Sequence, residues 1–307
     1  MASNMTLRFA LSQVKPDVPC SSKPAPTYRR PDWPELNVNV WSEFNLDTLN
    51  KSYGWVLDAP IALVTHQPDE VITPAALASA VIQDGHVPNQ LFAWNNIVLQ
   101  QTCNDAKDAL EITPGIVVRG EHGTVDTQKG IKLRNGSRYL LDHKITLDQN
   151  DEPYLVLGLG APSTICSGHV LRNPTLGESH GSHKWPLRRL ANLCKIANTR
   201  YGYIQTEREL IACCFTRTAA GTDSEPSWSV SIQSVPWSSY GSAVLTTDLA
   251  LWWLTMLALS DVKHRKIVPP EEVVKIDHWE TFYCEGRCCW IRRHSYSNLE
   301  EPVPPPA

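Results

Sequence analysis

A short segment in the middle of the chain carries residue types that could do acid–base or metal chemistry. Glu178 and His180 are two residues apart, so on a strand both side chains would point to the same face. A neutral imidazole could act as a base or bind a soft metal. His169 and His183 lie close by in the sequence, which leaves a transition-metal site open as a minor alternative. Glu178 and His180 are therefore the first catalytic candidates.

Basic residues follow this segment in a predicted helix, residues 185–197. Projected at 100° per residue, Lys184, Arg188 and Lys195 lie within about 40° of one another. This stripe could contact phosphate groups, or it could be a solvated helix face. Arg189 is a further candidate for anchoring a substrate, as is Arg200, which could bind an anion or pair with an acidic residue nearby, Glu207 or Glu209.

Three blocks of sequence together resemble a known family. Residues 177–185 read G-E-S-H-G-S-H-K-W, residues 199–210 contain T-R-Y-G-Y-I followed by T-E-x-E-L, and residues 245–253 read L-T-T-D-L-A-L-W-W after Trp237. In order, spacing and residue type they are similar to fungal PD-(D/E)XK nuclease-like proteins. The resemblance covers roughly residues 175–260, and the first half of the chain matches poorly.

The resemblance implies a metal-dependent nuclease site. In this family two acidic residues on adjacent strands hold a divalent cation such as Mg²⁺, which polarises the phosphoryl group and activates water. Glu178 takes the place of the second acid. Asp142, on a predicted strand, has the better spacing for the first, and Asp32 in the literal Pro-Asp pair is the alternative. His180 replaces the usual lysine, so this sequence lacks its permanent charge.

The elements that must position these residues change in type along the chain. Residues 1–35 are predicted to be a proline-rich disordered tail, residues 36–110 a helical segment, and residues 298–307 a second tail. Between them, short strands alternate with a helix, and Thr246 or Thr247 can cap another helix. This pattern predicts an α/β fold with a mixed central sheet flanked by helices. The nuclease-like core is assigned to residues 111–297.

Composition restricts the partners. The formal net charge of −4 does not favour gripping nucleic acid, because proteins that neutralise many phosphates are usually basic. The longest apolar run, residues 249–259, is too short to span a bilayer, so no membrane partner is expected. The nine cysteines form no tidy disulfide framework, and residues 1–10 lack a signal-peptide pattern. We expect an intracellular protein, cytoplasmic or nuclear and not secreted; the oligomeric state is not predicted.

Three functions compete. The first is a metal-dependent phosphodiesterase that uses Glu178, His180 and Asp142, with Lys184, Arg188, Arg189 and Arg200 contacting substrate. The second is an enzyme that reuses the cleft for a small molecule, for example in a biosynthetic pathway of secondary metabolism. The third is an inactive binding or regulatory scaffold. Fold alone does not choose among them.

Overall fold

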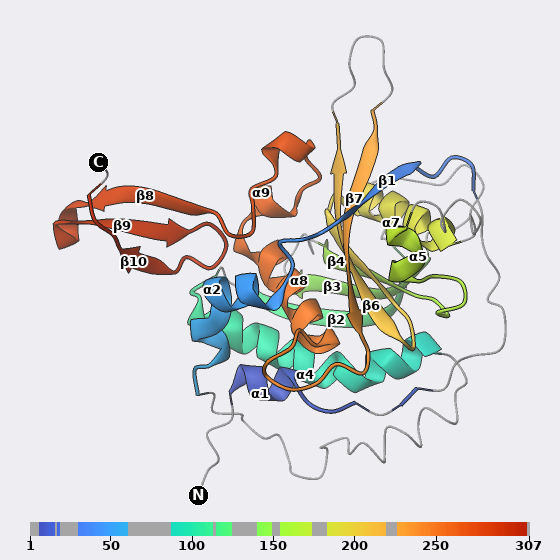
Figure 1. The fold of residues 1–307 in the computed structure, drawn as a ribbon. Helices are drawn as coiled ribbons and strands as arrows, with labels where there is room; N and C mark the ends of the chain where they lie inside the picture. Colours follow the sequence, from blue (N-terminus) through green and yellow to red (C-terminus); the bar gives the residue numbers. More distant parts are fainter. Residues whose placement is uncertain are drawn as a thin grey trace, which may run out of the picture.

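The computed structural model describes most of the 307 residues. The described ranges are residues 6–15, 17–18, 30–60, 87–112, 115–124, 140–148, 154–173, 183–218 and 226–305. Within them the chain builds an α/β body around one large sheet and a small second sheet formed by its C-terminal strands (Figure 1). No helix in these ranges combines the length and the apolar character that crossing a membrane requires.

The large sheet is mixed and has seven strands in the order β1-β7-β6-β5-β4-β3-β2. Neighbouring strands pair in antiparallel fashion except at β1–β7 and β4–β5, which are parallel. The strands are β1 (Leu36–Val40), β2 (Ile116–Thr124), β3 (Leu140–Asp148), β4 (Tyr154–Gly160), β5 (Tyr201–Gln205), β6 (Glu209–Arg217) and β7 (Trp228–Pro236).

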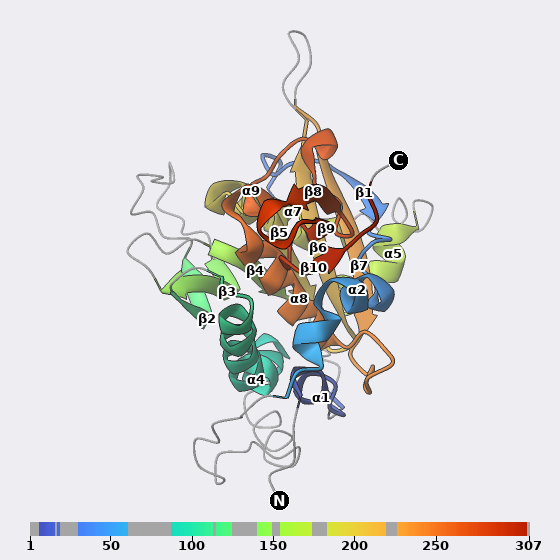
Figure 2. The same cartoon turned by 90° about the vertical axis from the view of Figure 1, so that its left-hand side faces the viewer.

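Helices cover both faces of this sheet. On one face α7 (Lys184–Ala197) packs on β4 and β5, and α5 (Gly168–Arg172) packs on β7 and β1. On the other face α8 (Thr247–Ser260) crosses β4 to β7, and α4 (Val87–Ala109) packs on α8 and β2. Figure 2 shows these layers from the side. Outside α4 and α8 lie α1 (Leu7–Leu11) and α2 (Leu46–Leu57), and α9 (Val262–Arg265) follows α8.

The core explains why α8 is apolar all round. Trp252 and Trp253 are fully buried in it. Trp253 stacks on Phe44 with ring centroids 4.2 Å apart, and Tyr53 meets Trp252 edge-on at 5.6 Å. The Thr246 side chain accepts a hydrogen bond from the Leu249 N–H and so caps the helix. A helix buried between a sheet and other helices needs no polar stripe.

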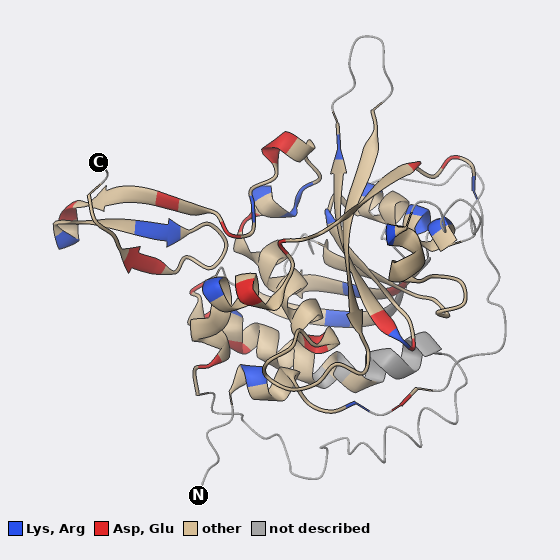
Figure 3. Cartoon of the chain, in the orientation of Figure 1, with Lys and Arg blue, Asp and Glu red and all other residues tan. Residues whose placement is uncertain are grey.

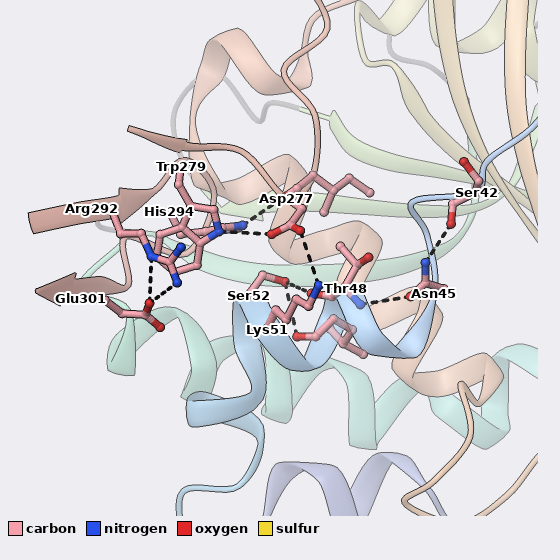
Figure 4. Close-up of polar contacts among 12 residues, drawn as sticks. Ser42, Asn45, Thr48, Lys51, Ser52, Asp277, Trp279, Arg292, His294 and Glu301 are labelled. Carbon is pink, nitrogen blue, oxygen red and sulfur yellow. Dashed lines mark hydrogen bonds and ion pairs between the residues drawn. The ribbon is translucent and has the colours of Figure 1, made fainter. Parts of the chain in front are cut away.

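The C-terminal sheet projects from the body and consists of β8 (Trp279–Cys284), β9 (Cys289–His294) and β10 (Glu300–Pro302), in the order β10-β9-β8. Its base is fixed to α2 by Asp277 (Figure 4). The Asp277 carboxylate accepts a hydrogen bond from Trp279 Nε1 at 3.1 Å and lies 3.8 Å from Lys51 Nζ. The Arg292 guanidinium donates to Glu301 across β9 and β10.

The structure confirms the α/β class with a mixed sheet flanked by helices, and it differs from the sequence analysis at the ends of the chain. Leu36–Val40 is a strand, although the segment from residue 36 was expected to be helical. Leu7–Leu11 is a helix with both end residues buried, and Glu300–Pro302 is a strand, although both lie in predicted tails.

Candidate functional site at the carboxyl edge of the sheet

The two central candidates, Glu178 and His180, lie outside the described residues. The chain on either side of them is described up to Asn173, just after α5, and from His183, just before α7. Their distance from any other group is therefore left open, and the site is built from the residues around them. The end of the sheet at which β4 and β5 stop, at Gly160 and Gln205, is named the carboxyl edge below. In open α/β sheets, ligands bind outside the carboxyl ends of parallel strands.

Asp142 lies at this edge, near the start of β3. Its Oδ2 accepts a hydrogen bond from the Gly160 N–H at 2.9 Å. An ionised carboxylate has two oxygens and about four acceptor sites, so this bond orients the carboxylate and leaves other acceptor sites available. Asp142 therefore lies beside the end of the parallel pair β4–β5.

The neighbouring strand β4 does not supply a second acid. Its sequence is Y-L-V-L-G-L-G, with neither a carboxylate nor a lysine. Gly158 faces the ring of Tyr203, and a Cβ added at Gly158 would lie 2.3 Å from Tyr203 Cζ. The Tyr203 hydroxyl accepts a hydrogen bond from Arg119 at 3.3 Å, and His143 stacks on the ring at 5.9 Å. Burial raises the pKa of the Tyr203 phenol, so this part of β4 is filled by a protonated, packed side chain.

Glu207 brings a further carboxylate to the carboxyl edge. The turn from β5 to β6 is closed by the Thr206 side chain, which accepts from the N–H groups of Arg208 and Glu209. Glu207 is 4% exposed, and its carboxylate accepts from the Ser163 N–H at 3.0 Å and from the Ser163 hydroxyl. Gly160 and Ser163 are three residues apart, so the N–H groups bound by Asp142 and Glu207 are at most about 11 Å apart.

Glu209 binds the next part of the same loop. Its Oε1 accepts from the Gly168 N–H at 2.9 Å, and its Oε2 accepts from the Ser234 hydroxyl. Gly168 is the first residue of α5, so Glu209 also offsets the positive end of that helix. Carboxylates in such contacts fix a loop in place, because each backbone N–H they bind would otherwise be buried without a partner.

Arg188 is not available to contact a substrate phosphate, contrary to the prediction for the basic stripe. It is 8% exposed, and its guanidinium donates to the carbonyl oxygens of Trp33 at 2.5 Å and Pro34 at 3.0 Å and pairs with Glu35 at 2.6 Å. It also lies over the Trp185 ring at 4.3 Å. The N-terminal segment that leads into β1 therefore covers this part of α7.

Arg200 is also enclosed by protein. It is 1% exposed, and it donates to the hydroxyls of Tyr201 at 2.9 Å and Tyr296 at 3.0 Å. It pairs with neither Glu207 nor Glu209, which lie at the opposite end of β5. Lys184 and Arg189 are partly exposed at the start of α7, and they are the two predicted substrate-binding residues that the structure leaves near the surface.

The described residues do not form a site for Mg²⁺ by themselves. Asp142 and its alternative Asp32, which is exposed in the segment before β1, are the predicted metal ligands among them, and the strand adjacent to Asp142 has no acidic residue. Across the described ranges, no three His, Cys, Asp or Glu side chains are grouped so that they could hold a metal ion. The residues covered include Cys284, Cys288, Cys289 and His294, which lie on β8 and β9 or in the turn between them.

Comparison with protein-family models, curated proteins and solved structures finds no match to this chain.

Sequence reasoning missed Glu207 and Glu209 as residues of the carboxyl edge. Both lie in the T-E-x-E-L block, where they were considered only as partners for Arg200. The tight turn after the buried strand is the feature that could have predicted their position. Acidic residues in such a turn lie beside the end of the strand. Their actual partners, Ser163 and Gly168, come from a loop about 40 residues upstream, which the local sequence does not reveal.

Proposed function

We propose that this chain is a divergent PD-(D/E)XK nuclease-like protein that holds a small-molecule ligand at its carboxyl edge and does not cleave nucleic acid. The resemblance of residues 175–260 and the mixed α/β sheet support the scaffold. Along the chain β4 is followed by α5 and α7 and then by β5, which is parallel to β4, so helices form the crossover between these two strands.

One observation carries the choice of function. The strand beside Asp142, β4, carries Gly158 and Gly160 at this end and has neither a carboxylate nor a lysine, and the Tyr203 ring occupies the space above Gly158. A pair of acids on adjacent strands β3 and β4 is therefore not formed. The small-molecule function from the sequence analysis remains, with Asp142 as an anchoring group.

The basic residues support the same choice. A protein that grips nucleic acid neutralises phosphates with accessible lysines and arginines. Arg188 and Arg200 are both enclosed by protein groups, and the formal net charge of the chain is −4. Two of the four predicted phosphate contacts are thus used inside the fold.

A second candidate is metal-dependent phosphodiester hydrolysis. Its support is that two carboxylates, Asp142 of β3 and Glu207 of the β5–β6 turn, bind N–H groups only three residues apart, those of Gly160 and Ser163. In that case Asp142 and Glu178 would hold the Mg²⁺ ion, which would polarise a phosphoryl group. His180 would stand where the family has its lysine.

A cleavage assay separates the two candidates. The protein is incubated with labelled DNA and RNA in the presence of Mg²⁺ or Mn²⁺, together with the variants Asp142→Asn and Glu178→Ala and the exposed control Glu271→Ala. We expect no metal-dependent cleavage by the wild type. Cleavage that both site variants abolish and the control retains would overturn the small-molecule proposal in favour of hydrolysis.

A positive test uses thermal unfolding with pools of metabolites. A ligand that binds the folded state raises the Tm, and Asp142→Asn should reduce that increase while Glu271→Ala should not. If no pool stabilises the wild type, or if Asp142→Asn is stabilised equally, the carboxyl edge is not the ligand site.

A further inference from the structure

A second candidate site lies at the other end of the sheet, where β5 begins, β6 ends and β7 begins. This end is named the amino edge. A cavity of about 330 Å³ opens there between the end of α7, the β6–β7 pair and the segment after α9. Its lining includes Lys195, Asn198, Arg217, Trp228, Ile267 and Pro269. It shares no residue with the carboxyl edge.

The lining combines two positive charges with an apolar wall. Arg217 and Trp228 are partners across β6 and β7, and the Arg217 guanidinium lies 5.5 Å from the centre of the Trp228 ring. Stacking on an indole holds a guanidinium in a fixed orientation while its N–H groups remain able to bind an anion. Ile267 and Pro269 extend the apolar surface beside the ring.

Neither cation has an acidic partner among the described residues. No ion pair involves Lys195 or Arg217 within the described part of the chain, and no acidic residue is among the described lining residues. This differs from Arg188, whose charge is met by Glu35. Figure 3 marks the lysine and arginine positions of α7 in blue on the ribbon.

The cavity walls are built by backbone contacts and do not depend on the two cations. The Arg217 N–H donates to the Val268 carbonyl at 3.2 Å, which fixes the segment after α9 against β6. Asn198 adopts a left-handed conformation and its N–H binds the Cys194 carbonyl, which ends α7. The C-terminal end of α7 carries a partial negative charge, equivalent to about half an elementary charge, which two full positive charges outweigh.

We propose that the amino edge binds an organic phosphate monoester whose dianion contacts Lys195 and Arg217 and whose apolar or planar body lies against Trp228, Ile267 and Pro269. A phosphate dianion matches two unpaired cations better than a single carboxylate does, and Arg binds phosphate through two parallel N–H donors. The cavity volume is at the lower end of the range of small-ligand sites, roughly 300–1,000 Å³, which fits a ligand of mononucleotide size.

The test is a calorimetric titration of the full chain with adenosine 5′-monophosphate, inorganic phosphate and adenosine as separate probes. We expect saturable binding of the monophosphate, weaker binding of phosphate and of adenosine, and competition between phosphate and the monophosphate. Arg217→Gln should weaken monophosphate binding by at least about tenfold, because a charge-assisted hydrogen bond is lost.

The matched control is Arg287→Gln, an exposed arginine on the projecting sheet that is 63% exposed. It should leave binding unchanged. Trp228→Phe keeps an aromatic ring and tests the apolar wall. It should weaken binding of the monophosphate and leave binding of inorganic phosphate unchanged. Circular dichroism confirms that each variant is folded.

Three outcomes would overturn the proposal: no saturable binding of the monophosphate at millimolar concentration, an equal loss in Arg287→Gln, or tight binding of an oligonucleotide without binding of the monophosphate. The last result would assign the amino edge to single-stranded nucleic acid instead. None of these outcomes depends on the carboxyl edge, so the two proposals stand or fall separately.

Discussion

The two ends of the central sheet differ in what their charged side chains bind. At the carboxyl edge, Asp142, Glu207 and Glu209 each bind a backbone N–H group of the segment that runs from the end of β4 to the start of α5. At the amino edge, Lys195 and Arg217 line a cavity and form no ion pair within the described residues. Charges of the first kind hold the fold together, whereas charges of the second kind are free to meet a ligand. The number of charged residues in a motif therefore says less about function than what those charges already bind.

The substitution with the largest expected effect tests whether the Tyr203 ring excludes a side chain from β4 beside Asp142. Gly158→Ala should lower the free energy of unfolding by at least about 3 kcal/mol, because the new Cβ would lie 2.3 Å from Tyr203 Cζ. Tyr203 cannot retreat without losing its contacts with Arg119 and His143. Urea unfolding measures the change.

Gly54→Ala, in α2, is the control for that substitution. Its added Cβ would lie 3.9 Å from Arg8 Nη2, which is an ordinary van der Waals distance. It should be neutral or stabilising by up to about 1 kcal/mol. The double variant Gly158→Ala with Tyr203→Leu should recover part of the loss. Without such recovery, Tyr203 is not what excludes a side chain from β4.

The second prediction concerns pH and the buried His264 of α9, whose ring centroid lies 4.2 Å from that of Tyr296. Burial and the positive charge of Arg200 lower the pKa of His264 from 6.5 to about 4. The other charged groups that face it are Lys263, Asp261 and His278. In the unfolded chain the pKa is near 6.5, so the unfolded state binds more protons between pH 6.5 and pH 4.

Stability from neutral His264 is therefore fully present above about pH 6.5 and is lost as the pH falls toward 4, by on the order of 3 kcal/mol. Urea unfolding at pH 7 and at pH 4.5 should show this loss in the wild type and a smaller loss in His264→Gln. His169→Gln, which replaces an exposed histidine on α5, should behave as the wild type. An unchanged pH dependence in His264→Gln would contradict the assignment.

The smallest expected effect compares the two edges directly. Glu209→Gln keeps the shape of the side chain and removes the charge that Gly168 and Ser234 bind, so it should cost about 1.5 kcal/mol. Lys195→Gln, on an exposed part of α7, should change stability by less than about 0.5 kcal/mol. Equal costs for the two substitutions would remove the contrast between a structural and an open edge.

Much of the fold could be predicted because its signals are local. The strands β5, β6 and β7 and the helices α7 and α8 have regular patterns and clear caps, such as Thr246. β1 was missed because its partner is β7, and a five-residue edge strand between a proline-rich segment and a helix gives little local evidence.

The site was harder to predict, because what matters is the partner of each charge. Arg188 is covered by residues near Trp33, and Arg200 by Tyr296. The cavity at the amino edge depends on the register that pairs Arg217 with Trp228 across a hairpin. A single sequence gives the residue types for such contacts but not the long-range pairings that decide whether a charge is enclosed or open.

The parallel pairing of β1 with β7 also sets the order in which the molecule can be completed. Leu36 and Trp228 are neighbours in the sheet although roughly 190 residues separate them. During synthesis the β1 segment is made before β7 and remains without its partner until roughly 190 more residues have been added. Such distant pairings slow folding and leave an unpaired strand exposed to other chains. The β1 edge of the sheet, together with the preceding segment that Arg188 of α7 binds, is therefore expected to form late in folding.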